Sequence, residues 1–209
     1  MTSTTEASRF WDGHHTARLP DGVPRANVRL VEVVTPLSPG RALDLGAGAG
    51  GDALWLARRG WRVTAADISA VALAHLDRRA RELGLADRIT TGRHDLAATF
   101  PAGPFDLVSA HYLHTSFPLP RDQVLRRAAE ALSPGGRLLV VEHGSVAPWS
   151  WNRDPDSVPP LAAPSLDPAE WTVERADALA RRATGPGGQT AEVVDHLLLI
   201  RRTAGKDPR

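Results

Sequence analysis

From residue 41 onward, short apolar runs with the composition of β-strands alternate with runs whose apolar residues recur at helical spacing. This alternation is typical of a mostly parallel sheet with helices on both faces, which is a doubly wound, Rossmann-like α/β fold. The pattern predicts one sheet of seven strands, at Arg41–Leu45, Arg62–Asp67, Arg88–His94, Phe105–Ala110, Arg137–Glu142, Trp171–Arg175 and Ala191–Arg201.

Helix start and stop signals lie between these strands. Ser69 is a good N-cap for a helix that ends at Gly84. Little chain separates the last two strands, so the final strand is predicted to be antiparallel, after a glycine-rich return. The predicted helices are Ala26–Thr35, Asp52–Arg59, the stretch from Ser69 to Gly84, Pro120–Leu132 and a short segment at Ala176–Ala183.

The chain is predicted to be a single domain, because 209 residues with 42% hydrophobic composition suffice for one sizeable core. Residues 1–40 are expected to form a segment and helix that cover the active site of a ligand-binding domain at 41–209. Residues 147–169 contain six prolines and are predicted to form a long loop rather than a linker to another domain, since the predicted strands make only one sheet.

Composition and charge exclude several classes of function. The chain has no cysteine, so it can form neither a disulfide nor a thiolate metal site. Its 25 basic and 24 acidic residues are interspersed, which argues against a nucleic-acid partner. No basic leader precedes an apolar run, and no apolar stretch approaches the roughly 18 residues of a membrane span. We therefore expect a cytoplasmic protein without membrane contact.

The most informative stretch is RALDLGAGAGGDALWLA at residues 41–57, where three glycines alternate between a strand and a helix. The residues Gly46, Gly48 and Gly50 permit a tight turn and let a ligand reach bare backbone N–H groups. Asp67 ends the second strand 21 residues after Gly46, where a carboxylate can accept both hydroxyl hydrogens of a ribose. These residues together predict an adenosine-containing cofactor.

A nicotinamide dinucleotide is one alternative, because Gly46, Gly48 and Gly51 also fit G-x-G-x-x-G. Three features favour S-adenosylmethionine. Asp44 can hold a positively charged amino group but would oppose a pyrophosphate, Asp95 can accept from the adenine amino group, and no second domain is left to bind a hydride partner. A cofactor-binding protein without turnover is the other alternative that stays open.

The motifs DLGAGAG at 44–50, Asp67-Ile68, Asp95-Leu96, FDLVSA at 105–110 and LSPGGRLLVV at 132–141 resemble those of class I S-adenosylmethionine-dependent methyltransferases, in that family's order. Phe10-Trp11-Asp12 and residues 51–69 are similar to the small tellurite-resistance-like and thiopurine-methyltransferase-like enzymes. The resemblance implies a seven-stranded sheet with an antiparallel last strand. It also implies transfer of a methyl group to sulfur, oxygen or nitrogen of a small acceptor, with S-adenosylhomocysteine as product.

Cofactor contacts are expected at ten positions, of which Ile68 and Leu96 follow from the resemblance. Trp11 lies outside the regular elements, and a tryptophan face attracts a cation such as a sulfonium. The alternative for Trp11 is packing of the N-terminal segment. The expected cofactor residues are Trp11, Asp44, Gly46, Gly48, Gly50, Asp67, Ile68, Asp95, Leu96 and His111.

His111 and His114 follow the fourth strand and are the predicted catalytic residues, because a histidine can take a proton from a hydroxyl or amine acceptor near neutral pH. A thiol acceptor needs no such base. The predicted acceptor-binding residues are His14, His15, His114 and Trp149, with Trp151 in the same closing loop. A structural role for each is the alternative. The histidine spacing matches no zinc pattern, so no metal is expected, and the protein is expected to be a monomer or homodimer.

Overall fold

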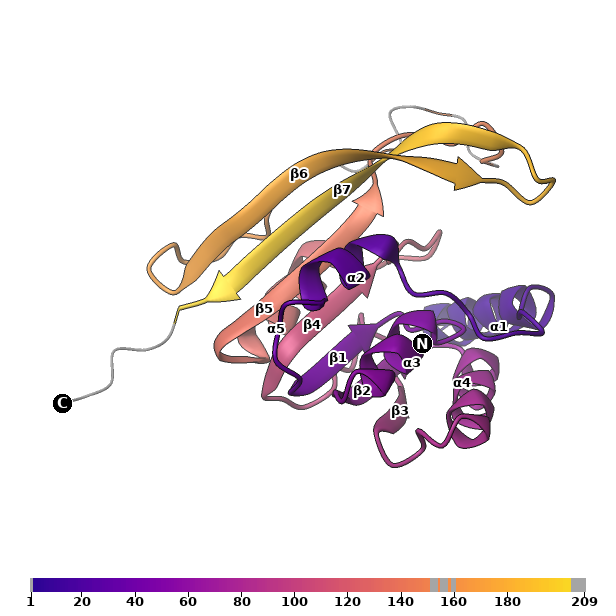
Figure 1. The fold of residues 1–209 in the computed structure, drawn as a ribbon, viewed down its shortest axis with the longest axis horizontal. Coiled ribbons are helices and arrows are strands. Elements are labelled where there is room, and N and C mark those ends of the chain that lie inside the picture. The colour runs from indigo at the N-terminus through magenta and orange to yellow at the C-terminus, as the bar shows by residue number, and fades with distance from the viewer. Residues whose placement is uncertain (1, 151–153, 155–157, 159–160, 204–209) are drawn as a thin grey trace.

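The computed structural model describes residues 2–150, 154, 158 and 161–203. Its centre is one seven-stranded sheet with the order β3-β2-β1-β4-β5-β7-β6 (Figure 1). All neighbours pair in parallel except β7, which is antiparallel to both β5 and β6. The strands are β1 (Arg41–Leu45), β2 (Arg62–Asp67), β3 (Ile89–Arg93), β4 (Phe105–His111), β5 (Leu132–His143), β6 (Trp171–Thr184) and β7 (Thr190–Arg202).

Helices cover both faces of this sheet, as predicted. The helices are α1 (Thr2–Thr16), α2 (Val28–Val34), α3 (Gly51–Arg58), α4 (Ala70–Glu82) and α5 (Arg121–Glu130). One core joins apolar side chains of α2, α3 and α4 to one face, with Leu54 and Leu76 buried. The second core places Val124 and Leu125 of α5 against the other face. The doubly wound α/β fold and its antiparallel last strand are therefore confirmed.

The prediction of a helix at Ala176–Ala183 was wrong, because these residues belong to β6. The alanine-rich sequence favours a helix on intrinsic propensity. Pairing with β7 runs from Trp171 to Thr184, and exposure alternates along the strand in the two-residue period of a sheet. The β6–β7 hairpin extends beyond the rest of the sheet at one end (Figure 1).

The N-terminal segment was expected to cover the site, and the structure makes residues 2–16 a full helix, α1, beside α4 (Figure 1). Asp12 fixes this position, because its Oδ1 accepts hydrogen bonds from Ser69 Oγ at 2.7 Å and from the Val71 amide at 3.2 Å. Asp12 thus caps the N-terminus of α4 from another helix. No described helix is long and apolar enough to cross a membrane.

A buried carboxylate ties α2 to the hairpin. Asp195 of β7 is fully buried and accepts hydrogen bonds from Arg29 Nε at 3.2 Å, Arg181 Nε at 2.7 Å and the Tyr112 hydroxyl at 2.9 Å. Arg29 also donates to the carbonyls of Leu179 and Ala180, both at 3.1 Å. One carboxylate therefore holds together α2, β6, β7 and the segment after β4.

We predict that Asp195→Ala lowers the free energy of unfolding by about 3–5 kcal/mol, since it leaves two guanidinium groups and a hydroxyl without their shared acceptor. Asp177→Ala is the matched control, because Asp177 pairs with Arg175 at the surface of the same hairpin and such pairs contribute less than about 1 kcal/mol. Urea unfolding of both variants measures this difference, and equal losses would contradict a structural role for the Asp195 cluster.

Candidate active site

The turn after β1 has the backbone conformation that its glycines predict. Gly46, Gly48 and Gly50 have φ values of +70°, +51° and +86°, in the left-handed region that side chains disfavour. The Gly46 and Ala47 amides donate to the Ala66 carbonyl at 2.8 and 3.1 Å, which holds the turn against β2. A Cβ at Gly50 would collide with Leu76 of α4. The turn therefore presents bare backbone at the carboxyl ends of the strands.

Asp67 connects this turn to the end of β2. Its Oδ2 accepts from the Gly48 amide at 2.9 Å and its Oδ1 from the Ser69 amide at 2.8 Å. The side chain is buried, so the two amides fix its orientation. Each oxygen keeps a second lone pair, and Asp67 lines the cavity in front of the turn.

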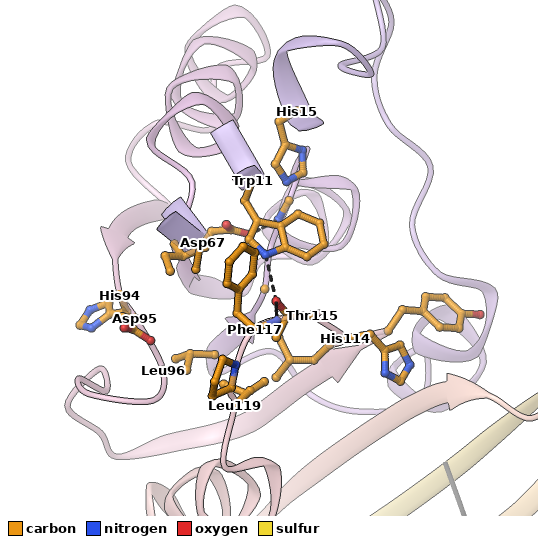
Figure 2. Close-up of a pocket in the computed structure, with 17 residues that line it drawn as sticks. Trp11, His15, Asp67, His94, Asp95, Leu96, His114, Thr115, Phe117 and Leu119 are labelled. Carbon is orange, nitrogen blue, oxygen red and sulfur yellow. Dashed lines mark hydrogen bonds between the residues drawn. The ribbon is translucent and has the colours of Figure 1, made fainter. Parts of the chain in front are cut away.

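This first cavity has a volume of about 250 Å³ and lies at the carboxyl edge of β1, β2 and β4. In Figure 2, Trp11 and His15 of α1 reach over it, Asp95 lies at one end and His114 at the opposite end. Nine of the predicted site residues line it, namely Trp11, His15, Gly46, Gly48, Asp67, Ile68, Asp95, Leu96 and His114.

Hydrogen bonds join α1 to the rim of the first cavity. Thr4 Oγ1 donates to Asp95 Oδ2 at 2.6 Å. Trp11 Nε1 donates to Thr115 Oγ1 at 3.4 Å, as the dashed line in Figure 2 shows. Arg93 additionally donates to Ser8 of α1. Thr115 and Phe117 also line the cavity. Neither could be predicted from the sequence, because both lie in a segment without regular structure.

A second cavity, of about 360 Å³, lies against the other side of the glycine turn. It is lined by Gly50, Asp52 and His111, by residues 24–28, and by Arg181 of β6. Tyr112 lines both cavities. The predicted catalytic pair is therefore divided, with His111 in the second cavity and His114 in the first.

His111 ends β4 and forms a carboxylate–imidazole pair with Asp52 of α3. Its Nδ1 lies 2.7 Å from Asp52 Oδ2, and the His111 side chain is 5% exposed. Because a carboxylate accepts, Nδ1 carries the hydrogen in this bond, and a neutral ring then has its lone pair on Nε2. Nε2 is buried and has no hydrogen-bond partner among the described residues. Asp52 is a site residue that the sequence presented only as the first turn of a helix.

His114, like His111, has one buried ring nitrogen without a hydrogen-bond partner among the described residues. Burial lowers the pKa of His114, so the ring is neutral near pH 7. Its Nε2 is buried without a hydrogen-bond partner in the part of the chain that the structure describes. Its ring stacks near His143, with centroids 5.7 Å apart, and His143 in turn stacks on Tyr112 at 4.3 Å.

Tyr112 has φ +49°, which is unfavourable for a bulky side chain. Its ring stacks on His143, its hydroxyl donates to Asp195 and accepts from Arg181, and its amide donates to the Val141 carbonyl. A strained residue persists only where its surroundings over-determine it. The strain lies at the boundary between the two cavities.

Asp44 lies beneath the turn and lines neither cavity. Its Oδ1 accepts from Ser109 Oγ at 3.0 Å, while Oδ2 is buried and has no partner among the residues described. Burial, together with the nearby negative charge of Asp52, raises the pKa of Asp44 to about 7. A cation that approaches Oδ2 would favour the ionised form.

Two residues predicted to bind the acceptor, His14 and Trp149, lie elsewhere. His14 of α1 has its Nδ1 3.2 Å from Nη1 of Arg18, in the turn after that helix, and lines neither cavity. Trp149 packs against Gly185 in the turn of the β6–β7 hairpin, where a Cβ would collide with its ring. Trp151 lies outside the described residues. Within the described residues, no group of three or more potential metal ligands comes together.

Comparison with known proteins identifies a domain within the chain. Residues 42–136 match the family described as a methyltransferase domain. The ubiquinone biosynthesis O-methyltransferase of Xylella fastidiosa is 31% identical over 134 residues, which are 64% of this chain and 54% of that protein. Other relatives are named as methyltransferases of small-subunit ribosomal RNA and of ribosomal protein L11. The chain spans between 32% and 56% of the length of the curated relatives.

Solved structures share the fold. TehB from Haemophilus influenzae superposes with a TM-score of 0.65 at 20% identity, over 85% of this chain and 63% of that one. An S-adenosylmethionine-dependent methyltransferase from Geobacter sulfurreducens, in complex with S-adenosylhomocysteine, has a TM-score of 0.51 at 26% identity, over 67% of this chain and 58% of that one.

Residues 42–136 form a class I S-adenosylmethionine-dependent methyltransferase domain. This confirms the family predicted from the glycine turn, and the likeness to TehB is consistent with the tellurite-resistance-like subgroup at the level of the fold. The methyltransferase domain contains the turn, Asp67 and His111, whereas Trp11 and Arg181 come from elements outside the matched residues.

We predict that Asp44→Asn stabilises the protein, and more so at pH 8 than at pH 5. With its raised pKa, the folded protein holds Asp44 protonated below about pH 7, while the unfolded chain ionises it near pH 4. Stability therefore falls as the pH rises from about 4 to about 7, by up to about 4 kcal/mol in all, and is then constant at higher pH; asparagine escapes this loss. Thermal unfolding at both pH values measures the effect. A stabilisation that does not change with pH would contradict it.

Proposed function

We propose that this protein transfers the methyl group of S-adenosylmethionine to an oxygen, nitrogen or sulfur of a small-molecule acceptor. The observation that carries the proposal is the first cavity, which brings the glycine turn, Asp67 and Asp95 together at the carboxyl edge of the sheet. This edge, where the strand order reverses between β1 and β4, is where open α/β sheets bind ligands.

The residues present fit an adenosyl sulfonium. The free lone pairs of Asp67 suit the ribose hydroxyls, and Asp95 and Leu96 lie at the end of the cavity where an adenine ring would reach them. Trp11 offers an aromatic face above the turn. Asp44 lies beneath the turn and lines neither cavity, so it receives no direct contact with the cofactor in this proposal. When bound, the cofactor supplies an activated methyl group.

A side chain of the protein must remove the proton from a hydroxyl or amine acceptor. His111 Nε2 is buried, and the carboxylate of Asp52 fixes the ring in the orientation and tautomer that leave this nitrogen as the acceptor. Asp52 is a positioning residue in this scheme. The remainder of the catalysis comes from orientation and from exclusion of water, which α1 supports by lying over the first cavity.

Several features favour a small acceptor over a macromolecule. The two cavities have volumes of about 250 and 360 Å³, which suit small molecules. The net charge of +1 gives no basis for attraction to ribosomal RNA. A relative named for ubiquinone biosynthesis agrees with a small acceptor, whereas those named for ribosomal substrates make RNA and protein the alternatives to test. A cytoplasmic location and a monomeric or dimeric state stay predictions.

Asp67→Asn should weaken binding of S-adenosylhomocysteine about tenfold or more, because an amide replaces the charged acceptor of two ribose hydroxyls. Asp87→Asn is the control, since Asp87 is an exposed aspartate away from both cavities. Isothermal titration calorimetry gives both affinities. If S-adenosylhomocysteine gives no heat of binding with the wild-type protein, the proposed function is contradicted. If Asp67→Asn binds it with unchanged affinity, Asp67 does not contact the cofactor.

His111→Gln should lower kcat by about 10²–10⁴-fold with a hydroxyl or amine acceptor, because the acceptor's proton then has no base. Asp52→Asn should lower kcat less, since it changes only the partner of Nδ1. Both variants should keep the wild-type affinity for S-adenosylhomocysteine. Methyl transfer from labelled cofactor to phenols, amines and thiols, with ribosomal RNA alongside, measures these effects. An unchanged kcat for a phenol would contradict a base role for His111.

A further inference from the structure

Two arginines line the second cavity with hydrogen-bonding capacity to spare. Arg25 is exposed and makes no hydrogen bond or ion pair with any part of the chain that the structure describes. Arg181 uses Nε for Asp195 and one terminal nitrogen for the Tyr112 hydroxyl, at 2.7 and 3.2 Å. A guanidinium has five N–H donors, so Arg181 keeps others for a ligand.

The charges around the cavity leave a positive excess. The single carboxylate of Asp195 is shared between Arg29 and Arg181. Asp52 also lines the cavity, but both of its oxygens are engaged, Oδ1 by the Asn27 amide at 2.6 Å and Oδ2 by His111 at 2.7 Å. The oxygens of both carboxylates therefore already accept hydrogen bonds from the protein, whereas Arg25 and Arg181 keep N–H donors without a partner among the described residues.

Backbone donors add to this side of the cavity. The eight-residue helix α3 begins here, and its N-cap, Gly50, offers no side-chain acceptor to the amides of the first turn. Such amides attract anions. His111 lines the same cavity, its side chain is 5% exposed, and its buried Nε2 has no partner among the described residues, which is a second observation that points to a ligand group there.

We propose that the methyl acceptor carries a carboxylate, that Arg181 and Arg25 bind this carboxylate in the second cavity, and that the reacting hydroxyl or amine lies at His111. The inference rests on the proposed function and narrows its acceptor to hydroxy or amino acids of small size. The acceptor's O–H or N–H bond breaks and its proton goes to Nε2. The acceptor's lone pair forms the new bond to the methyl carbon, and the electron pair of the broken carbon–sulfur bond stays on sulfur.

The test compares acceptors that differ only in the carboxylate: catechol with 3,4-dihydroxybenzoate, and phenol with 4-hydroxybenzoate. Each is titrated calorimetrically into the full chain saturated with S-adenosylhomocysteine. The carboxylated member of each pair should bind at least about tenfold more tightly, as expected for charge-assisted hydrogen bonds. Binding of neither member, or equal binding of both, overturns the proposal, whereas failure of S-adenosylhomocysteine to bind overturns the proposed function itself.

Two arginine variants test whether the second cavity causes the tighter binding of carboxylated acceptors. Arg181→Met and Arg25→Met should each remove most of the carboxylate advantage. Arg25→Met keeps the test valid if loss of the Asp195 contact unfolds Arg181→Met, since the Arg25 side chain makes no hydrogen bond or ion pair with the described residues. Arg182→Met is the matched control, because Arg182 is the next residue of β6, bonds to Thr190 and does not line the cavity.

A final measurement separates the acceptor's carboxylate from that of the cofactor. 5′-Methylthioadenosine contains the adenosine and sulfur of S-adenosylhomocysteine but lacks its amino-acid portion. Affinities of both compounds for the two arginine variants should equal those of the wild-type protein. If the variants weaken binding of S-adenosylhomocysteine and spare 5′-methylthioadenosine, the cavity holds the cofactor's own carboxylate and the proposal is overturned.

Discussion

The hydrogen bond from the Gly48 amide to Asp67 is the contact on which the arrangement of the site depends. It fixes the turn after β1 against the end of β2, with the glycine backbone uncovered. The same carboxylate accepts from the Ser69 amide, and Ser69 caps α4 while its hydroxyl donates to Asp12 of α1. A single chain of hydrogen bonds therefore runs from the turn through β2 and α4 to the helix that covers the first cavity.

Tyr112 separates two environments at the carboxyl edge. In front of the turn, the cavity under α1 contains carboxylates and apolar side chains, which suit a nucleoside. Behind it, the cavity next to β6 contains guanidinium groups, helix amides and a carboxylate-bound histidine. The strained backbone of Tyr112 is maintained by Asp195, so the same buried cluster that holds the hairpin also holds the boundary between the cavities.

Much of the fold and of the first cavity could be predicted from sequence. The alternation of strands and helices, the seven-stranded sheet and the antiparallel last strand follow from apolar spacing and from the short chain between the last two strands. Local patterns failed at Ala176–Ala183, where propensity favours a helix but pairing with β7 makes a strand. The pattern of the first 16 residues also did not reveal that they form a helix, because α1 is stabilised by contacts with α4 and the site rather than by a continuous apolar stripe.

The sequence by itself determined the glycine turn, the carboxylates at the ends of β1 and β2, and the methyltransferase family, because these features lie within short segments whose spacing is set by strand and turn geometry. Tertiary structure alone decided which side chains meet across the site. It paired His111 with Asp52, divided His111 from His114, and brought Arg181 from β6 beside Gly50. These residues are far apart in the chain, and their contacts depend on strand order and on the twist of a long hairpin, which no local spacing encodes.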